Sequence, residues 1–198
     1  MLVVGLGNPG KKYAETRHNA GFLVIDAVAK SEGLEDFREK FSGLFAKGRA
    51  FGKDVVLLKP QTFMNLSGDS VQPAMVFHKL APGDVIVVHD ELDLPFGEVR
   101  VKVGGGHAGH NGLRSILARV GSPDFVRVRV GIGRPPPSFP GDVADYVLQG
   151  FDPTERARLP ALVDDAVRAL ERVVRDGAAA AMGAVNAKSP PRNGPKRV

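Results

Sequence analysis

Short apolar runs that stop at glycine or polar residues predict buried strands in the first half of the chain. Residues 2–6 and 85–88 are two such runs. Residues 44–49 and 55–58 flank Gly52-Lys53-Asp54, so we expect these two segments to form a hairpin. Polar residues that directly follow these runs are therefore expected at strand ends.

Strict alternation of valine with charged residues predicts two further strands, residues 99–103 and 126–130. Half-buried strands of this kind suit the more exposed part of a sheet. If the two strands pair, they present one basic surface to water. Its members are Arg100, Lys102, Arg127 and Arg129.

Apolar residues also recur at helical spacing, which predicts four helices. These cover residues 20–30, 67–80, 111–120 and 154–176. Asp152-Pro153 is typical of a helix start, while Pro160 indicates either a kink or a later start. Gly68 and Pro73 leave the start of the second helix open, and repeated prolines predict a loop over residues 134–141.

Strands that alternate with helices, together with hairpin strands, predict an α/β fold with a twisted mixed β-sheet flanked by helices. No segment resembles an interdomain linker, and we expect a single domain over residues 1–186. Residues 187–198 are basic and rich in proline without an apolar face, so we expect this tail to be disordered.

Composition narrows the function. The 198 residues contain no cysteine, which excludes disulfides, thiolate nucleophiles and thiolate-bound zinc and fits a cytoplasmic location. No apolar run approaches the roughly 20 residues of a membrane-spanning helix, and the start lacks a signal region. The net charge of +5 favours anionic partners such as nucleic acid.

Asparagine-rich polar clusters, set beside glycines or at helix starts, are the main chemical feature. They are Gly7-Asn8-Pro9-Gly10, Thr62-Phe63-Met64-Asn65, Gly109-His110-Asn111-Gly112 and Thr16-Arg17-His18-Asn19. Amides both donate and accept hydrogen bonds, and imidazole moves protons near neutral pH. This combination indicates hydrolysis of a polar, carbonyl-containing substrate.

His18 and Asp90 are a candidate base and its carboxylate partner. A lone histidine before a helix is more often a cap or a surface residue. Asp90, however, ends a buried strand, where its carboxylate can accept the imidazole N–H and stabilise the imidazolium. Strand ends of open α/β sheets are also where ligands usually bind. The sequence does not show that the two side chains meet.

Three other readings of the motifs are weaker. Gly5-Leu6-Gly7-Asn8-Pro9-Gly10 matches a dinucleotide-binding pattern, but no helix or acidic strand end follows it as that fold requires. His107-x-x-His110 can bind metal, yet flanking glycines indicate a flexible loop rather than a rigid ligand helix. No G-x-S-x-G elbow occurs, which leaves water as the expected nucleophile.

The motifs together resemble the bacterial-type peptidyl-tRNA hydrolases, in family order and over nearly the whole chain. The matching segments are Val4-Gly5-Leu6-Gly7-Asn8-Pro9-Gly10, Tyr13, Thr16-Arg17-His18-Asn19-Ala20-Gly21, Thr62-Phe63-Met64-Asn65-Leu66-Ser67-Gly68, His89-Asp90-Glu91-Leu92-Asp93-Leu94-Pro95, residues 104–113 and Arg129-Val130-Gly131-Ile132-Gly133. The resemblance implies a single-domain α/β fold and cleavage of the ester between a peptide and the terminal ribose of tRNA.

The resemblance also implies roles for individual residues. His18 activates water and Asp90 orients it, with Asn8 beside them. Asn8, Asn65 and Asn111 match residues that hold the peptide and the 3′ end, and Asn8 matches one linked to selecting a blocked amino group. The cleft is lined by Tyr13, Phe63, Met64 and His110, and the residues matched to tRNA phosphate contacts are Lys102 and Arg129. The scheme requires no metal or organic cofactor, and family likeness favours a monomer.

Two alternatives stay open at this point. The same fold can serve as an RNA-binding module without turnover, and a metal-dependent hydrolase would lose activity with a chelator. For the oxyanion, Asn8 and Asn111 are the candidate donors, although either can instead hold the peptide.

Overall fold

A computed structural model of the chain describes residues 1–187 as an ordered succession of strands and helices. The strands are β1 (Leu2–Gly5), β2 (Arg38–Lys40), β3 (Gly43–Ala50), β4 (Lys53–Pro60), β5 (Val85–Glu91), β6 (Val99–Val103) and β7 (Val126–Gly131). The α-helices are α1 (Ala20–Glu32), α2 (Gly68–Phe77), α3 (Asn111–Val120), α4 (Val143–Val147), α5 (Pro153–Asp176) and α6 (Ala178–Asn186). Short 3-10 turns are η1 (Lys11–Tyr13), η2 (Arg17–Asn19), η3 (Met64–Leu66) and η4 (Pro82–Asp84).

The strands form one mixed sheet in the order β2-β3-β4-β1-β5-β7-β6. The central strands β4, β1, β5 and β7 run parallel, while β3 and β6 pair antiparallel with their neighbours. The predicted hairpin is confirmed as β3 and β4, and the two alternating strands do pair, as β6 and β7. The predicted α/β fold with a mixed sheet is therefore confirmed.

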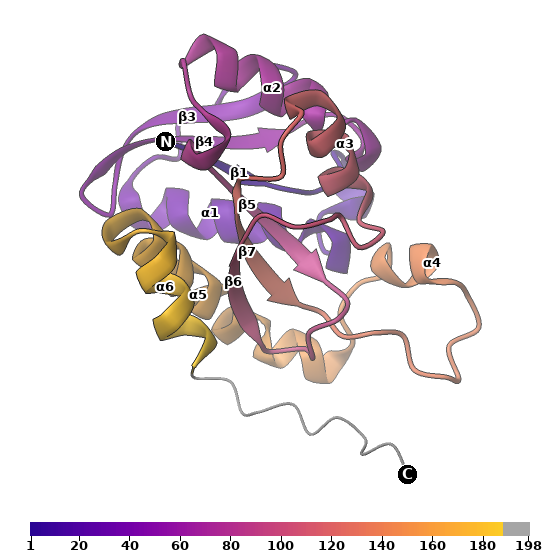
Figure 1. Cartoon of the computed structure of the whole chain (residues 1–198). Coiled ribbons are helices and arrows are strands. Elements are labelled where there is room, and N and C mark those ends of the chain that lie inside the picture. Colours follow the sequence, from indigo (N-terminus) through magenta and orange to yellow (C-terminus); the bar gives the residue numbers. More distant parts are fainter. Residues whose placement is uncertain (188–198) are drawn as a thin grey trace.

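Helices cover both faces of the sheet, so the domain has three layers (Figure 1). One apolar cluster joins the sheet to α1, α5 and α6, and a second joins the opposite face to α2 and α3. Residues of β5 alternate between the two clusters: Val85 and Val87 belong to the second, Ile86 and Val88 to the first. Burial on both faces explains why residues 85–88 of this strand are all apolar instead of alternating in polarity.

The connections that leave β1 and β5 run to opposite sides of the sheet, from β1 toward β4 and from β5 toward β7. From β1 the chain passes through α1 to the β3–β4 side of the sheet, then through α2 to β5 on the other side of β1. Such a switch point opens a crevice beyond the carboxyl ends of the two strands, where open α/β sheets bind ligands. The segments that leave this edge carry Asn8 after β1 and Asp90 at the end of β5.

Two glycines let α1 pack directly on the sheet at this edge. A Cβ atom at Gly21 would overlap the backbones of Leu6 and Val88, and one at Gly5 would overlap the backbone of Gly21. Gly5 therefore serves close helix–strand packing. A dinucleotide site requires an α-helix directly after the glycine pattern. Here the chain forms η1 and η2 between β1 and α1 instead.

Several boundaries differ from the sequence prediction. The long helix begins at Pro153, where Asp152 caps it with Glu155, and Pro160 lies inside it, so a later start is wrong. The second helix begins at Gly68. The sequence prediction missed β2, α4 and α6, which are short segments with three, five and nine residues.

Among residues 1–187, no helix is long and apolar enough to cross a membrane. The basic tail was predicted for residues 187–198. All of it except Ala187 lies outside the described part of the chain, so its predicted disorder stays a prediction.

Candidate active site

A cavity of about 780 Å³ lies at the carboxyl edge of β1 and β5. Its walls come from the loop after β1, from η2, η3 and the end of β5, from the loop before α3, and from α4. Nearly all of the predicted site residues line it: Asn8, His18, Phe63, Met64, Asn65, Asp90, Lys102, His110, Asn111 and Arg129. The topology alone thus assembles segments that are far apart in sequence.

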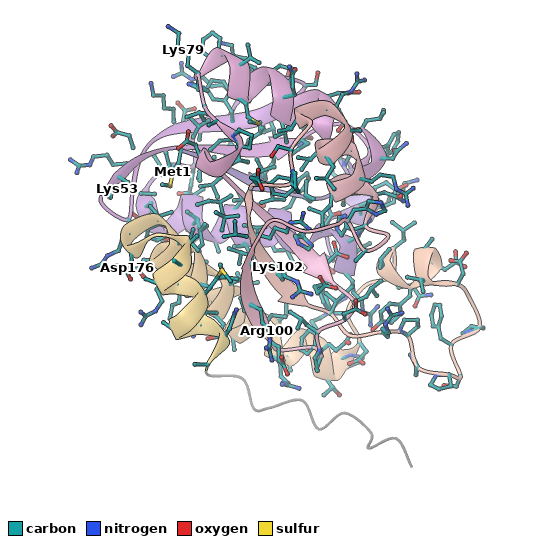
Figure 2. All side chains as sticks on the ribbon, viewed as in Figure 1. Met1, Lys53, Lys79, Arg100, Lys102 and Asp176 are labelled. Atoms are coloured by element: carbon teal, nitrogen blue, oxygen red, sulfur yellow. The ribbon has the colours of Figure 1, made fainter. Side chains whose placement is uncertain are left out.

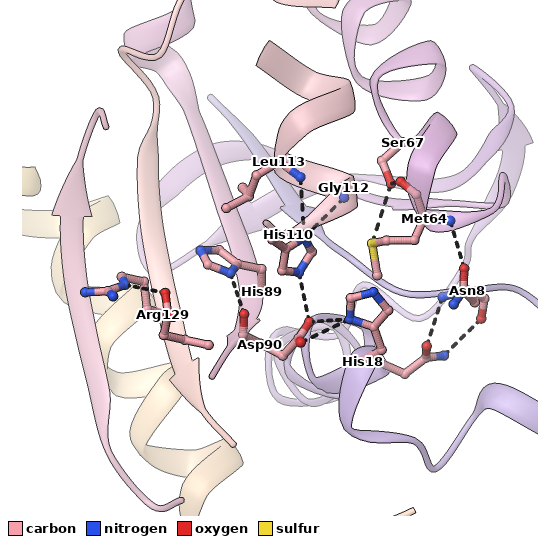
Figure 3. A network of polar contacts seen from close by, with 12 residues as sticks. Asn8, His18, Met64, Ser67, His89, Asp90, His110, Gly112, Leu113 and Arg129 are labelled. Carbon is pink, nitrogen blue, oxygen red and sulfur yellow. Dashed lines mark hydrogen bonds and ion pairs between the residues drawn. The ribbon is translucent and has the colours of Figure 1, made fainter. Parts of the chain in front are cut away.

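His18 and Asp90 meet, as the sequence reasoning required. Nδ1 of His18 lies 2.9 Å and 3.0 Å from the two carboxylate oxygens of Asp90. A carboxylate only accepts hydrogen bonds, so the His18 proton is on Nδ1 and Nε2 presents its lone pair. Figure 3 shows the two side chains facing one another at the centre of a polar network.

Burial and charge oppose each other in this pair. Burial disfavours the His18 imidazolium, but the charge of Asp90 and its hydrogen bond outweigh that effect and raise the pKa of His18 above 6.5. Burial likewise opposes ionisation of Asp90, yet His18 and His110 hold the pKa of this carboxyl well below its usual range. Asp90 is therefore ionised at neutral pH, and the imidazolium is stabilised when it forms.

His110 also contacts Asp90. Its Nε2 lies 2.9 Å from Oδ1 of the carboxylate, and its Nδ1 accepts from the backbone N–H groups of Gly112 (3.1 Å) and Leu113 (3.4 Å). The ring thus caps the N-terminus of α3 while it donates to the carboxylate. Asp90 is bonded to two imidazoles that stand on different segments, His18 in η2 and His110 just before α3 (Figure 3).

Asn8 is held by a partner that the sequence reasoning missed, Asn19. The backbone N–H of Asn8 donates to Oδ1 of Asn19 (2.9 Å), and the backbone carbonyl of Asn8 accepts from Nδ2 of Asn19 (3.0 Å). Oδ1 of Asn8 accepts the N–H of Met64 (2.8 Å), which fixes the orientation of the carboxamide. Within the described residues no partner engages Nδ2 of Asn8, so this N–H₂ group remains available to a ligand.

The remaining cleft residues divide into two groups. Phe63 (58% exposed) and Met64 offer apolar surface, and Asn65 and Asn111 are exposed amides at the starts of η3 and α3. Tyr13 lies half-buried in η1, with the Lys12 amine 4.6 Å from its ring centroid. It is not among the residues that line the cavity. A role for Tyr13 in substrate binding stays a prediction.

The predicted basic surface is only partly correct. The register places Lys102 opposite Arg127 and Arg100 opposite Arg129, so the four side chains do share a face. Arg127, however, is only 3% exposed, because it donates to the carbonyl groups of the glycine loop at Gly105 and Gly106. The half-buried strand predicted for residues 126–130 is therefore almost fully buried.

Ion pairs restrict this surface further. Arg100 pairs with Glu98 (3.2 Å) and Arg129 pairs with Glu91 (2.9 Å). Lys102 is exposed and has no ion pair with any described residue. Figure 2 shows Arg100 and Lys102 along β6. Of the two residues matched to phosphate contacts, Lys102 is freely accessible and Arg129 is charge-compensated.

Arg17 is a second missed residue, although it stands beside His18 in the same motif. It is 5% exposed and donates to the carbonyl of Gly150 (2.8 Å) and to Glu155 (2.6 Å), with its guanidinium 4.3 Å from the ring centroid of Tyr146. These contacts tie the segment that carries His18 to the chain between α4 and α5. The α4 segment in turn supplies an apolar wall of the cavity, including Val143 and Leu148.

The predicted histidine pair is not the closest ligand set. Nδ1 of His107 accepts from the N–H of Gly109, whereas His18, Asp90 and His110 bring ligand atoms within 4.8 Å of one another. Metal binding through Nε2 of His110 would move its proton to Nδ1, which faces two N–H groups. The donors at the helix start thus favour a hydrogen-bonded set over a metal set.

Comparison with known proteins agrees with this geometry. The family model described as peptidyl-tRNA hydrolase matches residues 2–193. The chain belongs to the peptidyl-tRNA hydrolase family. The resemblance inferred from the ordered motifs is therefore confirmed.

Relatives and solved structures of the family match over almost their full lengths. A peptidyl-tRNA hydrolase of Sorangium cellulosum is 59% identical over 191 residues, which are 96% of this chain and 86% of that protein. One of Geotalea daltonii is 54% identical over 94% of this chain and 96% of its own. The crystal structure of peptidyl-tRNA hydrolase from Acinetobacter baumannii superposes with a TM-score of 0.87 at 41% identity, covering 96% of both chains.

His89 gives the site a pH-dependent stability. Burial lowers the pKa of His89 to about 3, despite the hydrogen bond that its Nδ1 makes to the carbonyl of Asp90 (2.7 Å). Below pH 6.5 the unfolded chain binds a proton at His89 that the folded chain does not. We expect the free energy of unfolding to fall by roughly 3 kcal/mol between pH 6.5 and pH 4 from this residue alone.

Chemical denaturation at several pH values measures this effect in wild type and in His89→Asn, which retains a donor but does not titrate. The variant is expected to lose much of the pH dependence. His78→Asn is the matched control, because burial and nearby lysines lower the pKa of His78 in the same direction at a half-buried position outside the cavity. Equal slopes for wild type and His89→Asn would contradict the assignment.

Proposed function

We propose that this chain hydrolyses peptidyl-tRNA with His18 as the base that activates water. The family supplies the reaction, cleavage of the ester between a peptide and the 3′-terminal ribose. The observation that supports the role of His18 is the direction of its two nitrogens. Nδ1 is engaged by Asp90, and Nε2 has no partner among residues 1–187 in a side chain that lines the cavity.

In the proposed reaction a water molecule donates to Nε2 of His18 as its oxygen attacks the ester carbonyl. The proton moves to Nε2, and the imidazolium is stabilised by the charge of Asp90. Collapse of the tetrahedral intermediate breaks the bond to the ribose oxygen, which takes the proton back from Nε2. The products are a free peptide and a tRNA with an intact 3′ end, and Asp90 stays ionised throughout.

Asn8 is the better candidate for the oxyanion donor. Its Oδ1 is occupied by the Met64 N–H, so the carboxamide can offer only N–H groups to the substrate. Donors fixed in advance around a developing negative charge lower the barrier by a few kcal/mol. Asn111, which is exposed at the start of α3, retains both its donor and its acceptor and suits a role in holding the peptide or the 3′ end.

Two kinds of surface in the cavity suit the two parts of the substrate. Exposed apolar groups from Phe63 and α4 offer a surface for a peptide and for the bases of the 3′ end, because aromatic rings stack on bases. Cationic groups at Lys102 and Arg129 lie on the β6–β7 side and suit phosphates. We further propose that the enzyme acts as a monomer in the cytoplasm, where tRNA is used in translation.

Replacing His18 tests the catalytic proposal. We expect His18→Ala to reduce kcat by roughly 10²–10⁴-fold with little change in tRNA affinity, because a general base contributes about that much. In wild type, kcat/KM should rise with pH through a limb above pH 6.5, since the base must be neutral and Asp90 raises its pKa. The measurement is hydrolysis of a peptidyl-tRNA across this pH range.

Three controls separate the alternatives in the same assay. His78→Ala removes a histidine outside the cavity and should turn over as wild type does. A chelator should leave wild-type activity intact, and loss of activity would favour the metal-dependent reaction. Wild type that binds tRNA but releases no peptide would support the RNA-binding module, and near-normal turnover by His18→Ala would remove His18 as the base.

Salt dependence tests the phosphate contacts. Lys102→Ala should weaken tRNA binding and reduce the slope of log affinity against log salt concentration by about one unit, because one phosphate contact is lost. Arg129→Ala should also weaken binding, since it leaves Glu91 unpaired in the cavity. Arg168→Ala on α5 is the control with unchanged slope. An unchanged slope for Lys102→Ala would remove it from the tRNA surface.

A further inference from the structure

We propose that His110 is a positioning residue that holds Asp90 and limits how strongly the carboxylate acts on His18. The inference rests on the proposed role of His18 as the base. The sequence resemblance assigned His110 only to the lining of the cleft. The hydrogen bonds of both its ring nitrogens assign it a more specific role.

The start of α3 fixes the tautomer of His110. Nδ1 accepts from two backbone N–H groups, those of Gly112 and Leu113, and therefore carries no proton. The proton of the neutral ring is then on Nε2, 2.9 Å from Oδ1 of Asp90. His110 is thus a donor to Asp90 that the start of α3 holds in one orientation.

Asp90 divides its hydrogen-bonding capacity between two rings because of this donor. Oδ1 accepts from both His18 Nδ1 and His110 Nε2, each at 2.9 Å, and Oδ2 accepts from His18 at 3.0 Å. The bond from His110 fixes the rotation of the carboxylate, so that both oxygens face His18. It also draws part of the negative charge away from the base.

Few other charged groups face this carboxylate. His89 packs against the His110 ring at 5.1 Å between centroids but is neutral because of burial, and it bonds the backbone carbonyl of Asp90. The charge of Arg127 contributes to the lowered pKa of His89, and its guanidinium donates to the glycine loop at Gly106. The groups coupled to the Asp90 carboxyl are His18 and His110. Removing His110 therefore leaves His18 as the remaining partner.

Loss of the His110 donor has a predictable sign. The full charge of Asp90 would then act on His18 and favour its imidazolium still more. The fraction of neutral His18 at a given pH would fall, and the base would be available only at higher pH. Hydrolysis should suffer through kcat at moderate pH, while KM changes less, because the other residues that line the cavity stay in place.

Two substitutions separate the two bonds of the His110 ring. His110→Asn places its polar atoms near the position of Nδ1, so it can still cap α3 but is too short to reach Asp90. His110→Gln places its amide near the position of Nε2, so it can still donate to Asp90 but caps the helix poorly. Measuring both variants distinguishes a role in positioning Asp90 from a role in helix stability.

We expect His110→Asn to remain folded, with some loss of thermal stability because the buried Asp90 loses one donor. The acidic limb of kcat/KM should move up by roughly one pH unit, with activity below the limb reduced about tenfold. His110→Gln should be less stable, with its limb close to that of wild type. If activity instead follows stability, so that Gln is the poorer enzyme and the limb of Asn is unmoved, the proposal is overturned.

Titration of the His18 ring by NMR reads the effect without catalysis. In ¹⁵N-labelled protein the His18 signals, identified by their loss in His18→Ala, should titrate about one unit higher in His110→Asn than in wild type. An unmoved titration refutes the role of His110. A wild-type titration that does not coincide with the acidic limb of kcat/KM instead refutes His18 as the base, so the two failures are distinguishable.

Discussion

The site depends on one buried carboxylate. Asp90 ends a strand that is buried on both faces, and its side chain accepts hydrogen bonds from His18 and His110, which stand on different segments. Burial of a single charge is costly unless donors surround it. The two imidazoles supply those donors, and the charge in return sets the tautomer of His18. The chemistry of the cavity follows from this arrangement, since the tautomer decides which nitrogen faces the substrate.

The carboxylate reaches the histidine only because the backbone permits it. Gly21 lets the first turn of α1 lie against Leu6 and Val88, and this contact sets η2 beside the end of β5. Asn19 then fixes Asn8, and Arg17 anchors the same segment to the chain after α4. Four consecutive residues thus have separate roles: Arg17 and Asn19 hold the segment, His18 faces Asp90 and is the proposed base, and Ala20 begins α1.

The parts of the site that could be predicted are those with a local signal in the sequence. Ordered motifs identified His18 and Asp90, and apolar runs located the central strands. Patterns along one strand do not reveal what lies over it, so the glycine loop that buries Arg127 was missed. Helix α4 was missed because five residues show no period, although Asp142 and Asp145 form a capping box. The bonds of His110 combine distant segments and leave no sequence signal.

The proposed reaction requires that Asp90 hold the proton of His18 on Nδ1 and leave Nε2 free to accept a proton from water. Two-bond ¹H–¹⁵N spectra of the histidine rings distinguish the tautomers directly when recorded above the pKa of His18. We expect neutral His18 to carry its proton on Nδ1 and to lose this preference in Asp90→Ala. A His18 ring protonated on Nε2 in the wild-type protein would contradict it.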